Sequence, residues 1–166
     1  LLYWIVTRII VVHVIWTWNQ TCVILNGLVT VSEKQMSIII INYNTKILTQ
    51  NCIDSICLNT PDDFEYEIIV VDNSSDEKQI FPSSSAVKVT RANNLGFGHA
   101  CNTGAKEANG DVLLMLNSDT LITDDSLMCA YNYLVSHEDI GILGAKLILE
   151  DKTMDHGSKR GFPTPS

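Results

Sequence analysis

The sequence predicts an α/β domain in which helices cover both faces of a mostly parallel β-sheet. From Ser37 onward, short apolar runs of strand length alternate with longer stretches whose apolar residues recur at helical spacing. Strand–helix–strand order of this kind requires parallel strands joined by right-handed crossovers. The run Val112–Leu116 is apolar at every position, which is typical of a parallel strand buried on both faces.

Four runs are predicted as strands, and one further extended segment follows them. The runs are rich in β-branched or apolar residues, and most of them end at residues that favour turns. In chain order the predicted strands are Ser37–Ile41, Tyr66–Val71, Ala86–Thr90 and Val112–Leu116, and the extended segment is Ile140–Leu149.

Three helices are predicted between these strands. In chain order they are Thr45–Leu58, His99–Ala108 and Asp124–Ser136. Thr45 can cap the first helix, whose apolar spacing turns Ile47, Leu48, Cys52 and Ile56 inward. The second helix ends at Asn-Gly, because glycine readily adopts the left-handed conformation that follows a helix. The third opens with two acidic residues, which suit the positive end of a helix dipole.

The composition is that of a folded, acidic protein. Apolar residues make up 46% of the 166 residues and charged residues 18%, so the composition does not predict disorder. The net charge of -8 argues against non-specific binding to nucleic acid. The five cysteines are odd in number and none has CxxC spacing, which indicates reduced thiols of a cytosolic protein rather than disulfides or a zinc site.

Residues 1–35 differ in composition from the rest of the chain. The stretch LLYWIVTRIIVVHVIWTW carries a single charge, Arg8, and holds every Trp of the protein. About 20 apolar residues can cross a bilayer, but an arginine near the middle costs ~3 kcal/mol there. Met36 directly precedes the first predicted strand. We therefore predict that residues 1–35 lie outside the folded domain, with a membrane anchor as the alternative.

Polar clusters follow the apolar runs of three predicted strands. They are Asn42-Tyr43-Asn44, Asp72-Asn73-Ser74 and Asn117-Ser118-Asp119. Because parallel strands of this kind end on one edge of the sheet, the clusters predict a single ligand cleft there. The alternative is that they are ordinary turn and cap residues, with the tyrosine as a packed aromatic.

Several of these residues have side chains suited to a nucleotide. Asp119 is a hard oxygen ligand for Mg²⁺ or Mn²⁺ carrying a diphosphate. Asp72 can accept a hydrogen bond from a ring N–H of a base, and Tyr43 can stack on a base. The glycines of the loop Asn93–Gly98 let the backbone approach a nucleotide or phosphate closely. The match of this loop to a dinucleotide fingerprint is weak, because Cys101 holds the third glycine position, and no Walker loop occurs.

Three motifs carry a family resemblance. In this order and spacing, SIIIINYN, YEIIVVDNSS and NNLGFGHACNTGAKEANGDVLLMLNSDT resemble the family 2 glycosyltransferases, most nearly the bacterial rhamnosyltransferase-type branch that builds cell-surface polysaccharides. The resemblance covers about Ser37–Leu149. It implies a GT-A fold, a nucleotide-diphosphate sugar donor, a glycan or lipid-linked acceptor, a divalent metal (Mn²⁺ or Mg²⁺) and inversion at the anomeric carbon. It also implies a cytoplasmic protein, and association with the inner face of the cell membrane stays open.

The resemblance assigns roles to residues of the predicted cleft. Asp72 would contact the base with Tyr43 beside it, and Asp119 would be the main protein ligand of the metal. Asn117 stands at the first position of the family's DxD motif, which is usually acidic. The residues implied to line the nucleotide-sugar are Asn94, Gly96, Asn102 and Asn117.

The family's catalytic base and acceptor-binding half are expected beyond the matching region. An inverting transfer needs a carboxylate to deprotonate the acceptor hydroxyl, and the sequence offers no convincing candidate. We therefore predict a donor-binding domain at 36–150, the start of an acceptor-binding part at 151–166, and no sugar transfer by this chain alone. The alternatives are a nucleotide-sugar-binding module without turnover, a nucleotide-sugar pyrophosphorylase, which would need a basic glycine-rich loop after the first strand, and a dehydrogenase, which would bind NAD.

Overall fold

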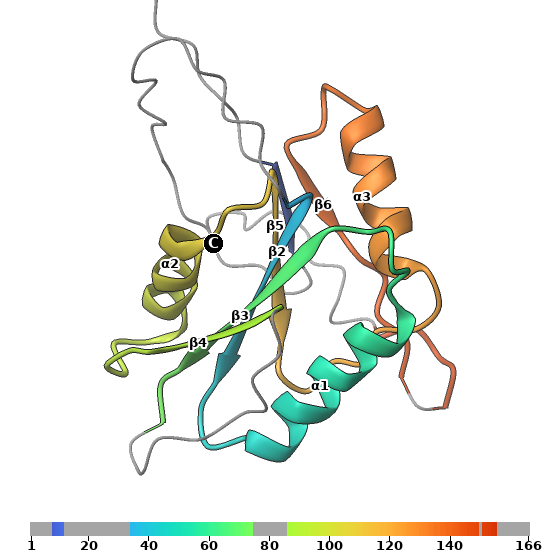
Figure 1. Cartoon of the computed structure of the whole chain (residues 1–166). Coiled ribbons are helices and arrows are strands. Elements are labelled where there is room, and N and C mark those ends of the chain that lie inside the picture. Colours follow the sequence, from blue (N-terminus) through green and yellow to red (C-terminus); the bar gives the residue numbers. More distant parts are fainter. Residues whose placement is uncertain (1–7, 12–33, 75–85, 150, 156–166) are drawn as a thin grey trace, which may run out of the picture.

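A parallel β-sheet forms the centre of the molecule (Figure 1). The computed structural model describes residues 8–11, 34–74, 86–149 and 151–155, and expectations that involve Cys22 or the Ser83–Ser85 run lie outside them. Within the described part, a six-stranded sheet has the order β4-β3-β2-β5-β1-β6, and its pairings are parallel. The strands are β1 Arg8–Val11, β2 Met36–Asn42, β3 Tyr66–Asp72, β4 Val87–Arg91, β5 Val112–Asn117 and β6 Ile142–Gly144.

Helices cover both faces of this sheet, as predicted. α1 (Lys46–Asn59) and α3 (Ser126–Ser136) lie on one face, and α2 (Phe97–Glu107) lies on the other (Figure 1). The alternation of β2 explains the two layers, because Ile38 and Ile40 pack into the core that includes α1 and α3, while Ile39 packs with α2. All seven residues of β2 are buried, which fits a continuous apolar strand at the centre of a parallel sheet. The predicted fold class is confirmed.

The N-terminal segment contributes a strand that we did not expect. β1 lies between β5 and β6, with Arg8 paired to Val112 on one side and Ile9 paired to Ile142 on the other. The prediction that residues 1–35 lie outside the folded domain therefore does not hold for residues 8–11. The sequence of an apolar run does not distinguish a buried strand from a membrane segment. Only pairing with β5 and β6, which are distant in the chain, identifies residues 8–11 as a strand. Among the residues that the structure describes, no helix has the length and apolar character needed to cross a membrane.

The first turn of α1 also departs from the predicted pattern. Ile47 is 77% exposed and Leu48 45% exposed, whereas Thr49 is fully buried. Asn42 lies under this turn. Its side-chain oxygen accepts hydrogen bonds from the Thr45 backbone N–H and the Thr49 hydroxyl. A polar group therefore occupies the position where the helical pattern predicted apolar packing. Of the extended segment predicted at 140–149, only β6 (Ile142–Gly144) is a strand of the sheet.

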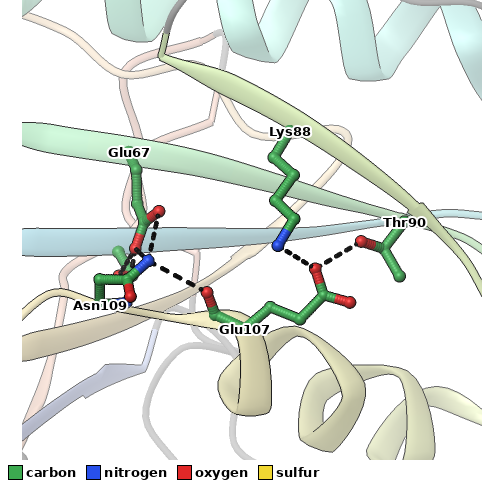
Figure 2. Close-up of polar contacts among 6 residues, drawn as sticks. Glu67, Lys88, Thr90, Glu107 and Asn109 are labelled. Carbon is green, nitrogen blue, oxygen red and sulfur yellow. Dashed lines mark hydrogen bonds and ion pairs between the residues drawn. The ribbon is translucent and has the colours of Figure 1, made fainter.

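A polar cluster at the amino edge of the sheet fixes the start of β5 (Figure 2). Glu67 Oε1 accepts hydrogen bonds from Ser37 Oγ and from the Asn109 backbone N–H, both at 2.6 Å. Ser37 Oγ in turn accepts the Gly110 N–H at 2.8 Å. A Cβ at Gly110 would lie 2.5 Å from the Ser37 backbone nitrogen, so only glycine fits against β2 here. The connection from α2 is thereby held in register with β2 and β3.

Candidate functional site

The polar ends of the central strands lie together at the carboxyl edge of the sheet. Parallel pairing sets Asn42 of β2 opposite Asp72 of β3, and Ile41 of β2 opposite Asn117 of β5. The three clusters predicted from the sequence therefore adjoin one another, as parallel strands require. This edge is where open α/β sheets bind their ligands.

Asn42 is the centre of a buried hydrogen-bond network at this edge. Its Nδ2 donates to Asp72 Oδ1 at 2.9 Å and to Ser74 Oγ at 3.2 Å. Its Oδ1 accepts from the backbone N–H of Thr45 at 3.3 Å and from the hydroxyls of Thr45 and Thr49 at 3.2 and 2.9 Å. The fully buried amide thus joins the ends of two strands to the first turn of α1.

Asp72 belongs to the same network and is fully buried. Its Oδ1 also accepts the Ser74 backbone N–H at 3.1 Å, and its Oδ2 lies 3.6 Å from Arg91 Nη1. Arg91 Nη2 donates to the Ser74 carbonyl at 2.9 Å, so the guanidinium closes over the turn that follows β3. A buried carboxylate needs such partners, because removing a charge from water is costly.

A cavity of about 240 Å³ opens beside this network, on the face that α2 covers. It is lined by Ile41, Tyr43, Thr45, Phe97, Asn117, Ser118 and Asp119. Tyr43 is half exposed and Phe97 is the first residue of α2, so two aromatic residues line this hollow together with the polar turn after β5. Three residues predicted from the sequence, Tyr43, Asn117 and Asp119, therefore lie around one hollow.

Four other predicted residues are not in the lining of this cavity. Asp72 points to the side of the sheet that α1 covers, as Val70 does two positions earlier. Asn94 and Gly96 lie in the exposed loop before α2, where Asn94 Oδ1 accepts the Gly96 N–H at 3.3 Å. Gly96 has a φ of 96°, a conformation that glycine adopts without strain. Asn102 lies half-buried inside α2.

The donors beside the cavity fit a hard divalent cation. Asn117, Ser118 and Asp119 bring oxygen atoms, and Asp119 is an exposed carboxylate. Within the described residues no group of three His, Cys, Asp or Glu side chains could hold a metal by themselves. A single carboxylate suits Mg²⁺ or Mn²⁺ that is held jointly with substrate phosphates.

Burial and, to a lesser extent, the negative charge of Asp119 raise the pKa of the Cys52 thiol to about 12.

Asn73 and Phe97 were given no role from the sequence, although Asn73 stands in one of its polar clusters, and of the two only Phe97 lines the cavity. Asn73 is 3% exposed, and its Oδ1 has no hydrogen-bond partner in the part of the chain that the structure describes. A buried amide oxygen without a partner is costly, so Asn73 is suited to a ligand donor. Its position directly after Asp72 was the available signal. Phe97 was treated as part of a glycine loop, and only the fold brings it to Asn117.

Comparison with known proteins identifies the family of this domain. Residues 37–156 match the family described as Glycosyl transferase family 2, and the match covers more than half of the 166 residues. The chain belongs to glycosyltransferase family 2. The resemblance to the family 2 glycosyltransferases is thereby confirmed at the level of the family, and so is the GT-A fold, whereas the rhamnosyltransferase-type branch stays a prediction.

Relatives of this family 2 domain are longer proteins. Over 107 residues it is 31% identical to a poly(ribitol-phosphate) beta-glucosyltransferase of Bacillus spizizenii, covering 60% of this chain and 17% of the relative. Over 97 residues it is 27% identical to the O-antigen biosynthesis protein RfbC of Myxococcus xanthus, covering 55% of this chain and 8% of the relative. The chain thus spans less than a fifth of either relative.

A solved structure shares the fold of this family 2 domain. It is S. aureus TarS 1–349 in complex with UDP-GlcNAc, with a TM-score of 0.50 and 25% identity. The match covers 62% of this chain and 32% of that one. A structure of the same protein in complex with UDP matches to the same extent, at 24% identity.

Proposed function

We propose that this domain binds a nucleotide-diphosphate sugar and serves the transfer of its sugar to a glycan or lipid-linked acceptor. The observation that carries the proposal is the cavity at the carboxyl edge of a family 2 domain, which Tyr43, Phe97 and Asp119 line together. Support comes from the named activity of the Bacillus relative and from the UDP and UDP-GlcNAc complexes of TarS. Polysaccharide assembly at the inner face of the cell membrane suits such a protein.

The base of the donor would stack on Tyr43, which is half exposed at the rim of the cavity. The sequence resemblance assigns the polar contact with the base to Asp72, whose carboxylate already accepts two hydrogen bonds. We assign this contact also to Asn73, because its buried Oδ1 can accept a ring N–H. Asn94, Gly96 and Asn102 would line the nucleotide from the α2 side.

The diphosphate would lie beside Asn117 and Asp119, where Mn²⁺ or Mg²⁺ can be shared between protein and phosphate oxygens. A bound divalent cation supplies charge that stabilises the leaving diphosphate. Asp119 would hold the cation, Asn117 would contact the nucleotide-sugar, and Phe97 would limit the access of water. Inversion at the anomeric carbon, and a sugar of the rhamnose type, are the further proposals that the sequence motifs support.

A second candidate function is donor binding without turnover. Asp119 is the one carboxylate among the residues that line the cavity, and the metal requires it. An inverting transfer needs a separate base within ~3 Å of the acceptor hydroxyl. A sugar-transfer assay with nucleotide-sugars and a lipid-linked acceptor separates the two functions.

Calorimetry with UDP, in Mn²⁺ and in EDTA, tests the donor site on the full chain. Mn²⁺ should tighten UDP binding to the wild type, and Asp119→Ala should abolish this gain while leaving the affinity in EDTA unchanged. Asn73→Ala should weaken binding by ~1–3 kcal/mol in both conditions, since a base contact does not depend on the metal. Asp62→Ala, an exposed carboxylate outside the cavity, is the control. Equal Mn²⁺ gains in wild type and Asp119→Ala would refute the proposed metal ligand.

A further inference from the structure

Thr45 lies between the buried Asn42 network and the turn that carries Asp119. It precedes α1 directly, where a threonine side chain often accepts a helix N–H, but it makes no such cap bond here. Its hydroxyl instead contacts Asn42 Oδ1 and Ser118 Oγ, each at 3.2 Å. The hydroxyl therefore joins the end of β2 to the turn after β5, and it leaves the helix end without its cap.

The direction of these hydrogen bonds is fixed by groups that cannot reverse their roles. Asn42 Nδ2 faces the Asp72 carboxylate at 2.9 Å, and an ionised carboxylate can only accept. Asn42 Oδ1 faces the Thr45 backbone N–H at 3.3 Å, which can only donate. If the Asn42 amide were flipped, its oxygen would face the Asp72 carboxylate and its NH₂ group would face the Thr45 N–H. The oxygen of Asn42 therefore faces Thr45.

This orientation determines where the proton of Ser118 lies. An amide oxygen cannot donate, so the Thr45 hydroxyl is the donor in its contact with Asn42, whose oxygen also accepts the Thr45 N–H and the Thr49 hydroxyl. Because the Thr45 hydroxyl has one proton, Ser118 is the donor in the contact with Thr45 whenever that proton lies toward Asn42, and the proposal rests on this arrangement. Once its proton is committed, the Ser118 oxygen offers only lone pairs to any other group. Ser118 lines the same cavity as Asn117 and Asp119, whose oxygens suit a hard cation.

We propose that Thr45 is a positioning residue that holds the Ser118 oxygen as an acceptor toward the coordination shell of a divalent cation beside Asp119. The proposal rests on the proposed donor-binding function and adds to it a residue that acts through Ser118. Without the Thr45 hydroxyl, the Ser118 proton is free to rotate into the cavity. A hydroxyl proton that points at a cation opposes its binding, so the metal-dependent part of donor binding should weaken.

The test is a titration of the full chain with Mn²⁺ in saturating UDP, following free Mn²⁺ by electron paramagnetic resonance. Thr45→Val should weaken Mn²⁺ binding by about threefold to tenfold, the effect of one lost hydrogen bond. Thr45→Ser keeps the hydroxyl and should restore wild-type affinity. UDP affinity in EDTA should fall less in Thr45→Val than Mn²⁺ affinity does, because the lost hydroxyl acts on the cation through Ser118. The matched control is Thr60→Val, which removes a buried hydroxyl bonded to the Ile56 carbonyl at the other end of α1.

Other outcomes distinguish a failure of the Thr45 proposal from a failure of the proposed donor site. Wild-type Mn²⁺ affinity in Thr45→Val, or an equal loss of UDP affinity with and without Mn²⁺, would overturn the positioning role. Should Thr45→Val not fold, Ser118→Ala replaces it, and wild-type Mn²⁺ affinity in Ser118→Ala would overturn the proposal as well. If the wild type itself gains no UDP affinity from Mn²⁺, the proposed metal-dependent donor site fails first, before any variant is compared.

Discussion

Replacing Glu67 by alanine should destabilise the domain without touching the candidate site. Glu67 sits at the amino edge of the sheet, where its carboxylate receives hydrogen bonds from Ser37 and from Asn109; Figure 2 shows the contact with Asn109. These bonds hold the connection between α2 and β5 against β2 and β3. The site lies at the opposite end of β5, so the effect of the substitution on stability can be separated from its effect on binding.

The expected magnitude follows from the bonds that are lost. Both 2.6 Å bonds end on a charged acceptor; the part-buried bond from Ser37 contributes ~1.5–3 kcal/mol, and the exposed bond from the Asn109 N–H contributes less. The two longer contacts from Asn109 Nδ2, at 3.2 and 3.3 Å, add little because Asn109 is exposed and water can replace them. Glu67 is only half-buried, so we expect a net loss of about 2–4 kcal/mol. A loss of ~3 kcal/mol lowers the Tm of a chain of this size by roughly 6–12 °C.

Urea and thermal unfolding of the full chain measure this loss. The matched control is Glu107→Ala, which removes a carboxylate that lies in the same view and binds Lys88 Nζ at 2.6 Å and Thr90 Oγ1 at 2.7 Å. The Lys88 side chain is 57% exposed, so this pair should contribute no more than ~1 kcal/mol. A cost for Glu67→Ala no greater than that for Glu107→Ala would refute the structural role. UDP affinity well below the unfolding transition should be unchanged in both variants.

Two further predictions concern packing and thiol chemistry. Gly110→Ala should destabilise by at least ~2–3 kcal/mol, because its Cβ would meet the β2 backbone at 2.5 Å, whereas Gly141→Ala, which has open space, should change the free energy of unfolding by under ~0.5 kcal/mol. Urea titration compares the two, and equal effects would contradict the close approach. Cys57 is exposed and should react with a thiol reagent at pH 8, whereas Cys52, whose pKa burial raises to about 12, should react only on unfolding. Mass spectrometry after brief labelling of the native protein distinguishes them, and fast labelling of Cys52 would count against its burial.

The central strands and the polar residues at their ends could be predicted from the sequence. The apolar runs at β2 and β3 are β-branched and the run at β5 is continuously apolar, and the helices between strands favour parallel pairing through crossovers. Once these strands are parallel, the neighbouring positions of Asn42, Asp72 and Asn117 follow without further information. The candidate cleft was predictable for this reason, although no single cluster predicts it.

Features that depend on distant partners could not be predicted in the same way. β1 is specified by its pairing with β5 and β6, which are remote in the chain, and its residues alone fit a membrane segment equally well. The burial pattern in the first turn of α1 also depends on a residue outside the helix. Ile47 has the spacing of a core residue, yet Asn42 occupies the space beneath it and Ile47 is exposed.

Asp72 and Asn73, both proposed for the base contact, show what strand alternation adds to a motif. Both residues follow the same apolar run, and composition alone favours the carboxylate. Residues of β3 alternate between the two faces, so Asp72 shares the α1 side with Val70 and there completes the hydrogen-bond network of Asn42. Val71 packs on the α2 side, and the cavity lies on that side too, lined by Ile41 from the neighbouring strand. Asn73 is one step further along the chain, and its buried Oδ1, which has no hydrogen-bond partner among the described residues, supports adding Asn73 to Asp72 in the proposed base contact.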